Sequence, residues 1–185
     1  GLLNGEGQYK WSSGSVYKGN YSQNMRNGYG NITYSDGRSY EGFWLNDKRD
    51  GKGRMTWPDG GYYKGIFKNN DLWEGHGNLT WNSHDHYEGG FKDGKFDGVG
   101  EYIWKNGQVY VGSYKNGLRG QGNMTFANGN YYEGEFKEDK YDGEGSFTWK
   151  DGRVYVGSFK NGLRDGQGTY TGKNGQAYVG SYKNG

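Results

Sequence analysis

The stretch Gly51–Lys68 reads GKGRMTWPDGGYYKGIFK, and its pattern decides the fold. In Gly53–Trp57, apolar and polar residues alternate with a period of two, which is typical of a half-buried β-strand. A PDG tripeptide follows at residues 58–60, with Pro suited to the first position of a type I turn and Gly to a left-handed position. We therefore infer a β-hairpin in which Trp57 pairs with Gly61.

This pairing fixes the register of the two strands. Counting back from the turn places Met55 opposite Tyr63 and Gly53 opposite Gly65. The large side chains, including Phe67, then share one face of the sheet. The two facing glycines leave a trough without side chains, in which the rings of an adjoining hairpin can lie.

The same unit recurs along the whole chain. A Tyr-x-Gly triplet and a Gly-x-Gly triplet each return once every 22 to 24 residues, which indicates an array of stacked repeats. The predicted hairpins span approximately residues 5–22, 28–45, 51–68, 75–92, 98–115, 120–137, 143–160 and 166–183. The structural residues of the repeat are Tyr17, Gly19, Tyr40, Gly42, Tyr63, Gly65, Tyr87, Gly89, Tyr110, Gly112, Tyr132, Gly134, Tyr155, Gly157, Tyr178 and Gly180.

We expect an all-β fold in which residues 1–185 form one array of eight consecutive β-hairpins. The hairpins would make an elongated, single-layer, twisted antiparallel sheet, open at both ends, as a rod or groove. Sixteen strands spaced by about 4.8 Å give a length of roughly 75 Å. The chain stops at the start of another connecting loop, so we expect the array to be a fragment of a longer protein.

Composition narrows the class of function. The chain has 39 Gly, 19 Tyr, 8 Phe and 7 Trp but a mean hydropathy of −1.20, so the expected core is aromatic. The lack of Cys excludes disulfides and thiolate metal sites and fits a reducing, cytoplasmic location. A net charge of +2, with both signs interspersed, argues against nucleic acid as a partner. No apolar run approaches the ~18 residues of a membrane span.

One family resemblance emerges from these motifs. The sequence YEGEFK at residues 132–137, followed by DGEGSFTWKDG at residues 142–152, resembles the membrane occupation and recognition nexus (MORN) repeat. The resemblance covers essentially the whole chain in eight copies. Two positions depart from the pattern: Ser83-His84 replaces the Asp-Gly turn of the fourth copy, and Gly172 replaces the aromatic residue of the eighth. Aspartate also often takes the position of a family histidine, at Asp50, Asp97, Asp142 and Asp165.

The resemblance implies a non-catalytic structural scaffold and protein-protein interaction module. Similar arrays occur in cytoskeletal and ciliary assemblies such as axonemal radial-spoke heads, with proteins of a larger assembly, including other repeat arrays, as partners. The alternative that it leaves open is a peripheral membrane module that binds acidic phospholipids. A third class, a carbohydrate-binding or choline-binding module, also uses aromatic repeats, but its Gly-Trp pattern differs from Tyr-x-Gly.

Three aromatic residues and one arginine form a candidate partner-binding row. Trp73, Phe96 and Tyr141 occupy the slot two residues before Gly-x-Gly, which arginine fills in other repeats, and Arg119 aligns with the same slot. Aromatic and Arg side chains are enriched at binding hot spots. The alternative is that each ring packs over its own repeat as part of the core.

The membrane alternative has its own candidate residues. Arg26, Lys48, Arg49, Lys52 and Arg54 gather in the loops and strands of the first repeats, where they could face acidic lipids. Nearby aspartates reduce the net positive charge of this group.

No residues form a convincing catalytic, cofactor or metal site. No Ser has a neighbouring His and orienting carboxylate, so we expect no enzyme activity and no cofactor. His84-Asp85-His86 is the one histidine cluster, but a replaced hairpin turn explains it as well as a metal does. A separate apolar patch, at residues such as Val109, Val111 and Val156, lies on the predicted polar face and fits either an interface or ordinary strand composition.

Overall fold

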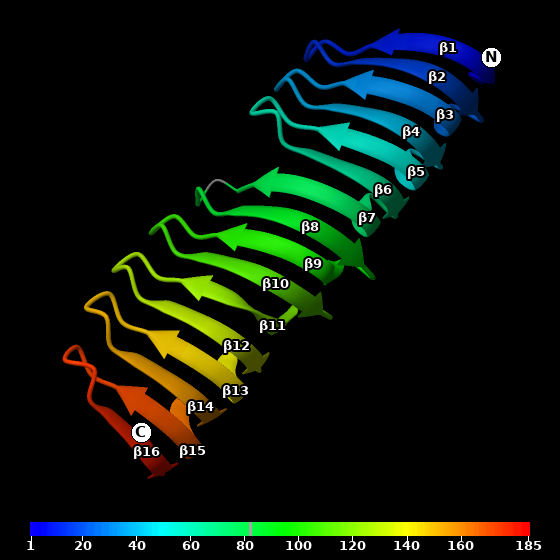
Figure 1. Cartoon of the computed structure of the whole chain (residues 1–185). Coiled ribbons are helices and arrows are strands. Elements are labelled where there is room, and N and C mark those ends of the chain that lie inside the picture. Colours follow the sequence, from blue (N-terminus) through cyan, green and yellow to red (C-terminus); the bar gives the residue numbers. More distant parts are fainter. Residues whose placement is uncertain (82) are drawn as a thin grey trace. The chain divides into compact units, whose positions relative to one another are not determined.

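The computed structural model describes residues 1–81 and 83–185, and within them every regular element is a β-strand (Figure 1). The strands follow one another in chain order in an antiparallel sheet, which confirms the all-β hairpin array. They are β1 (Gly5–Lys10), β2 (Val16–Ser22), β3 (Met25–Thr33), β4 (Ser39–Leu45), β5 (Lys48–Thr56), β6 (Tyr62–Lys68), β7 (Asp71–Thr80), β8 (His86–Lys92), β9 (Lys95–Ile103), β10 (Val109–Lys115), β11 (Leu118–Thr125), β12 (Tyr131–Lys137), β13 (Lys140–Thr148), β14 (Val154–Lys160), β15 (Leu163–Thr171) and β16 (Ala177–Tyr182).

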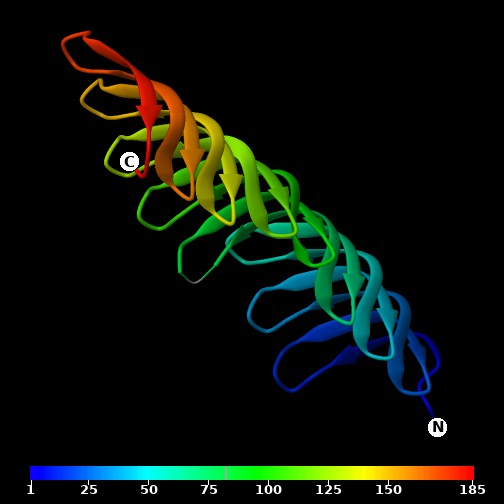
Figure 2. The same ribbon diagram turned by 90° about the horizontal axis from the view of Figure 1, so that it is seen from below.

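The chain divides into two compact units, each built from the same kind of hairpin. The first unit comprises Gly1–Thr80 and Glu88–Lys95, and the second comprises Trp81–Tyr87 and Phe96–Gly185. Within each unit the strands are visibly twisted and curved (Figure 2). This is the right-handed twist that side-chain and carbonyl sterics impose on L-residues.

Two kinds of turn alternate along the chain. The wider turn is the PDG loop, in which the Trp57 amide donates to the Gly61 carbonyl at 2.9 Å, as predicted. The tight turn has two residues with positive φ, for example Asn46 at 48° and Asp47 at 67°. That geometry defines a type I′ turn, whose twist matches the twist of the flanking strands. From the sequence, only a connecting loop is expected between hairpins, and the structure gives this loop the geometry of a tight hairpin turn.

The register predicted from the sequence is confirmed, and it extends further than expected. Met55 faces Tyr63 and Gly53 faces Gly65. Glycine also faces glycine between successive hairpins, so a continuous glycine ladder takes one residue from each of β1–β7 in the first unit and one from each of β9–β16 in the second. In the first unit the ladder is Gly7, Gly19, Gly30, Gly42, Gly53, Gly65 and Gly75, and in the second it is Gly100, Gly112, Gly122, Gly134, Gly145, Gly157, Gly168 and Gly180.

Tyrosines of the Tyr-x-Gly triplets lie over glycines of this ladder. A Cβ atom added to Gly53 would collide with the hydroxyl and ring of Tyr40, and one added to Gly30 would collide with those of Tyr17. The ladder therefore leaves space for these rings, and the rings are fully buried: Tyr17, Tyr40, Tyr63, Tyr87, Tyr110, Tyr132 and Tyr155 are at most 1% exposed. We call the side of the sheet that carries these tyrosines the aromatic face and the other side the reverse face.

The next hairpin completes the cover of each tyrosine. Phe67 contacts Tyr63 of its own hairpin at a centroid distance of 5.1 Å and Tyr40 of the preceding hairpin at 4.9 Å, both edge to face. Trp44 contacts Tyr40 and Tyr17 in the same way, at 5.1 and 5.5 Å. Such aromatic pairs contribute about 0.5–1.5 kcal/mol each beyond area burial, which compensates for the small number of aliphatic residues.

The tyrosine hydroxyl has a structural role as well as the ring. The pairing of β2 with β3 shifts register between Gly19 and Tyr21, and there the Tyr17 hydroxyl donates to the Asn20 carbonyl at 3.0 Å. Because phenylalanine lacks this donor, the bond gives a reason why tyrosine alone occupies this position in every repeat. The same bond, from the Tyr hydroxyl to the carbonyl three residues later, joins Tyr40 to Phe43, Tyr63 to Ile66, Tyr110 to Ser113, Tyr132 to Glu135 and Tyr155 to Ser158.

The one-residue insertion in the fourth repeat changes the local register. Between β6 and β7 the shift falls at Trp73, so Gly65 faces Gly75 and Tyr63 faces Gly77. In the other hairpins the second Gly of Gly-x-Gly faces the Tyr-x-Gly glycine instead. The glycine ladder is thus kept by using the first glycine of the triplet.

Candidate functional site

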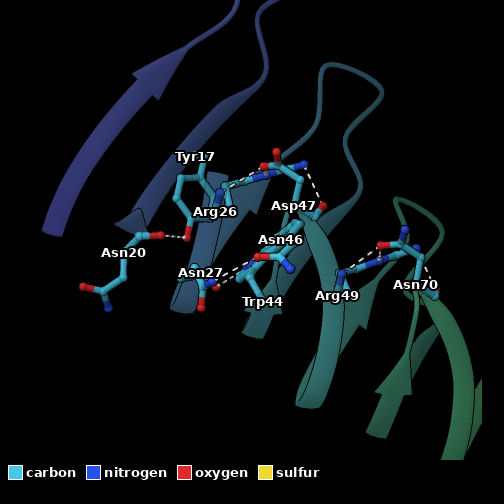
Figure 3. A network of polar contacts seen from close by, with 10 residues as sticks. Tyr17, Asn20, Arg26, Asn27, Trp44, Asn46, Asp47, Arg49 and Asn70 are labelled. Carbon is cyan, nitrogen blue, oxygen red and sulfur yellow. Dashed lines mark hydrogen bonds and ion pairs between the residues drawn. The ribbon is translucent and has the colours of Figure 1, made fainter. Parts of the chain in front are cut away.

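The slot before each Gly-x-Gly triplet lies on the aromatic face, at the tight-turn ends of β3, β5, β9, β11, β13 and β15. Arg26 shows the arrangement (Figure 3). Its guanidinium carbon lies 4.2 Å from the ring centroid of Trp44 and 5.8 Å from that of Tyr17, a cation-π geometry. Its Nε also forms an ion pair with Asp47 at 2.9 Å, and only 18% of its side chain is exposed. Arg26 therefore packs between the aromatic rings of two successive hairpins.

Each tight turn is also fastened to the turn before it. The Arg26 amide donates to the Asp47 carboxylate at 3.0 Å, and the Asp47 amide donates to the Arg26 carbonyl at 3.0 Å. Burial raises the pKa of Asp47, but these bonds and the guanidinium charge outweigh it and hold that pKa below its usual value. Arg49 repeats the pattern with Asn70 as its partner, since its amide donates to the Asn70 amide oxygen at 2.8 Å (Figure 3).

The predicted partner-binding row occupies this slot in the second unit. Phe96 stacks on Tyr87 at a centroid distance of 3.8 Å, and Tyr141 stacks on Tyr132 at 4.0 Å. Arg119 lies 5.0 Å from the ring centroid of Phe136 and forms an ion pair with Asp139 at 2.8 Å. All three row residues are half-buried, so each packs on the core and keeps part of its surface on the aromatic face.

Trp73, the fourth residue of the predicted row, belongs to the first unit and is displaced by the insertion. Leu72 faces Phe67, in the position that arginine or an aromatic residue takes in other repeats. The Trp73 carbonyl still accepts the bond from the next turn, donated by Gly94 at 2.9 Å. Its indole lies 4.1 Å from Lys68 Nζ. Trp73 therefore keeps the slot's backbone link but not its packing against the aromatic stripe.

Two hollows open on the aromatic face on either side of Arg119. One has a volume of about 450 Å³ and is lined by Trp104, Phe126, Phe136 and Tyr141, among others. The other, of about 310 Å³, is lined by Phe96, Tyr102, Tyr114 and again Trp104. The aromatic core expected from the sequence would include Trp104 and Phe126, but both are only half-buried. Both residues lie at the end of a strand, next to a wide turn, and this position in the sequence could have indicated their exposure.

The five candidate lipid-facing residues do not form one surface. Arg26 and Arg49 lie on the aromatic face with partners, and Lys48 Nζ bonds the Asn69 side chain in the tight turn at 3.4 Å. Lys52 and Arg54 alternate with Gly53 and Met55 along β5 and therefore lie on the reverse face, where they line a separate groove.

The aspartates that replace the family histidine stabilise tight turns. The carboxylate of Asp50 accepts a hydrogen bond from the Asn69 amide at 3.1 Å, in the first residue of the next turn. This amide belongs to a residue with positive φ, so the bond supports a conformation that non-glycine residues rarely adopt. The same bond joins Asp97 to Asn116, Asp142 to Asn161 and Asp165 to Asn184.

The histidine cluster lies at the position of a wide turn and has two of its features. The Trp81 amide donates to the Asp85 carbonyl at 3.0 Å, and His84 takes the left-handed position, with φ of 70°, that glycine takes elsewhere. The Asp85 carboxylate accepts the Lys105 amide at 2.9 Å, and its pKa is lowered chiefly by that bond. In the part of the chain that the structure describes, no group of three or more His, Cys, Asp or Glu side chains is arranged to hold a metal ion.

Comparisons with known proteins agree with the repeat pattern. The MORN repeat matches residues 1–16, 17–37, 40–62, 63–86, 87–109, 110–131, 132–152 and 155–177. No curated protein matches the chain in sequence. The described residues contain no helix with the length and apolar character needed to cross a membrane.

Solved structures provide distant similarities. The SAS-4 (dCPAP) TCP domain of Drosophila melanogaster, in complex with a proline-rich motif of Ana2 (dSTIL), is 14% identical, with a TM-score of 0.46 over 96% of this chain and 90% of that one. The TCP10 domain of Danio rerio CPAP is 12% identical, with a TM-score of 0.37 over 95% and 94% of the two chains. The eight repeat matches, which extend over nearly the whole sequence, show that this chain belongs to the MORN repeat family.

Proposed function

We propose that this chain is a non-catalytic scaffold that binds protein partners within a larger cytoskeletal or ciliary assembly, of the axonemal, radial-spoke-like kind. The observation that carries the proposal is the half-exposed aromatic surface around Arg119, with a hollow on each side. Trp, Tyr and Arg dominate the binding energy of protein interfaces, and they do so in concave pockets that exclude water.

The ionisable groups support a structural use of the polar residues. Burial raises the pKa of Tyr17, Tyr63 and Tyr110 to about 12, which leaves these phenols protonated as hydrogen-bond donors to the backbone. The aspartates with lowered pKa values, such as Asp47 and Asp85, accept amide hydrogen bonds in or near the turns. A scaffold needs such rigidly held turns, whereas a catalytic acid or base needs a pKa near the working pH.

The test is capture of partners from ciliated cells, by proximity labelling and mass spectrometry. The wild-type chain is expected to recover axonemal or cytoskeletal proteins, and Trp104→Ala with Phe126→Ala is expected to lose them. Leu118→Ala with Leu163→Ala is a matched control, because these side chains are 47% and 48% exposed and lie in the tight-turn region. Thermal unfolding of each variant separates lost binding from lost folding.

Two outcomes would overturn the proposal. If the aromatic variant folds and still captures the same proteins, the surface around Arg119 is not the interface. If the wild-type chain captures no such proteins but sediments with vesicles containing phosphatidylserine, the peripheral membrane alternative takes its place.

A further inference from the structure

The reverse face of the third repeat contains a groove of about 570 Å³, which we call the third-repeat groove. Its floor is the glycine ladder, and its size falls in the range of roughly 300–1,000 Å³ that is typical of ligand pockets. It crosses β4, β5 and β6, and Tyr29 of β3 borders it. Its lining residues are Tyr29, Glu41, Gly42, Lys52, Gly53, Arg54, Lys64, Gly65 and Ile66.

Three cations in this groove have no acidic partner. Arg54 and Lys64 face each other directly across β5 and β6, and Lys52 lies two residues from Arg54 on the same strand. Among the described residues, none forms an ion pair or side-chain hydrogen bond with any of the three. Like charges directly opposite each other destabilise a sheet. The groove therefore holds a repulsion that a bound anion would relieve.

Among the described residues that line the groove, Glu41 supplies the carboxylate, and this group is already hydrogen-bonded. Glu41 is the cross-strand neighbour of Arg54, yet it accepts a hydrogen bond from the Tyr29 hydroxyl at 2.6 Å. The Arg54 guanidinium instead lies 5.1 Å from the ring centroid of Tyr62. The aromatic neighbours thus keep the acid and the base apart, which leaves the positive charge available to a ligand.

Other repeats do not share this charge. The corresponding three positions of the sixth repeat hold Gln121, Asn123 and Glu133. The basic groove is therefore a property of the third repeat and not of the repeat pattern.

We propose that the third-repeat groove binds an acidic, extended segment of a partner protein. This proposal rests on the proposed scaffold function and assigns it a second contact surface. The spacing of the cations favours an extended chain: Lys52 and Arg54 are two residues apart, or about 7 Å along a strand, which is also the spacing of carboxylates at alternate positions of an extended peptide.

The position of the cations favours a peptide over a membrane surface. They lie in the middle of β5 and β6, next to Gly53 and Gly65 in sequence, and not in the turns at the strand ends. The neighbouring cations Arg26 and Arg49 lie on the aromatic face and are already bonded to turn residues. A flat membrane would not reach both faces of one sheet.

The direct test is fluorescence anisotropy with a labelled peptide of alternating Glu and Ser, eight residues long. The expected result is binding to the wild-type chain that weakens as salt rises, because salt screens the charges. The variant Lys52→Gln/Arg54→Gln/Lys64→Gln is expected to bind at least tenfold more weakly. It should melt at the same temperature as the wild type or higher, since the facing like charges are removed.

A matched control removes the same charge elsewhere. Lys137→Gln/Lys150→Gln/Lys160→Gln changes three exposed lysines of the second unit and is expected to bind the peptide as the wild type does. Equal weakening in both triple variants would show unspecific attraction to net charge and overturn the proposal. Sedimentation of the wild type, but not of the groove variant, with phosphatidylserine vesicles would overturn it in favour of a lipid site.

The outcomes separate this proposal from the proposed function. The Trp104→Ala/Phe126→Ala variant has an intact third-repeat groove and is expected to bind the acidic peptide normally. If that variant loses its captured proteins while the groove variant binds peptide like the wild type, the groove proposal fails and the scaffold proposal stands.

Discussion

The hydroxyl of Tyr40 lies 2.9 Å from the carbonyl oxygen of Phe43, to which it donates a hydrogen bond. The ring of the same tyrosine is 1% exposed and covers Gly53 in the next strand. One side chain therefore packs two successive hairpins together and also holds the backbone where the strand register shifts.

Removing that hydroxyl tests its role. Tyr40→Phe keeps the ring but leaves the Phe43 carbonyl without this donor, which is expected to lower the free energy of unfolding by about 1–2 kcal/mol. Tyr29→Phe is the control, because Tyr29 is 48% exposed and bonds a surface carboxylate. Urea unfolding measures both variants. An equal loss of stability in the two variants would show that the buried Tyr40 hydrogen bond contributes no more than the exposed one of Tyr29.

The glycine ladder predicts where a methyl group is tolerated. Gly53→Ala drives a Cβ into the Tyr40 ring and is expected to cost about 1–3 kcal/mol, as overpacking does. Gly7→Ala is the matched control, since it occupies the same ladder position on β1 and its Cβ would meet Tyr21 at an ordinary 3.6 Å. Thermal unfolding compares them. If Gly7→Ala destabilised the protein as much as Gly53→Ala does, the tyrosine ring packed over each ladder glycine would not be the reason why glycine is required there.

Stability is expected to fall at alkaline pH. Burial raises the pKa of Tyr17, Tyr63 and Tyr110 from 10.0 to about 12. A group with a raised pKa in the folded state stabilises the fold below its unfolded pKa, and that contribution is lost as the pH rises from 10 through 12. Denaturant unfolding across this interval, combined with tyrosinate absorbance, measures the loss. Ionisation of all tyrosines near pH 10 without loss of stability would contradict the prediction.

The tight turns predict that Asn can replace Asp. Asn70 holds Arg49 as Asp47 holds Arg26, so Asp47→Asn is expected to change the free energy of unfolding by less than about 0.5 kcal/mol. Asp47→Ala removes the acceptor and is expected to cost about 1 kcal/mol. Because the Asp47 pKa is lowered by folding, its contribution is lost as the pH falls through that pKa, and Asp47→Asn is expected to remove this acid dependence. Urea titrations at neutral and acid pH decide between these outcomes.

Much of the fold was predictable because its determinants are local and repeated. The alternation in Gly53–Trp57 and the PDG turn were enough to set the register of one hairpin, and the repeat period extended it to the rest. The type I′ turns were missed because their residues vary from Gln23-Asn24 to Glu138-Asp139. Asn-Gly at residues 116–117 carried the signal, since that dipeptide favours positive φ at both positions.

The candidate sites were less predictable because they depend on which face a side chain occupies after a register shift. Arg26 and Arg54 look alike in sequence, but one packs between aromatic rings and the other lines the reverse face. The structure defines the positions and contacts of the partner-binding row and of the lipid-facing residues. Their roles in binding stay predictions. The Trp73 carbonyl keeps the backbone bond of its slot, but the residue spacing does not show that Leu72 takes the packing position of that slot.

The dependence of each buried tyrosine on the following hairpin has a consequence for biosynthesis. A chain made from its amino terminus completes the cover of Tyr17 only when Trp44 has left the ribosome, and that of Tyr40 only when Phe67 has. Within each unit, the newest hairpin on a nascent chain therefore presents an uncovered aromatic ring until its successor emerges. Cotranslational folding of this array is therefore expected to lag synthesis by one repeat. The exposed aromatic surface of the newest hairpin, which is prone to aggregation, moves along with the growing chain.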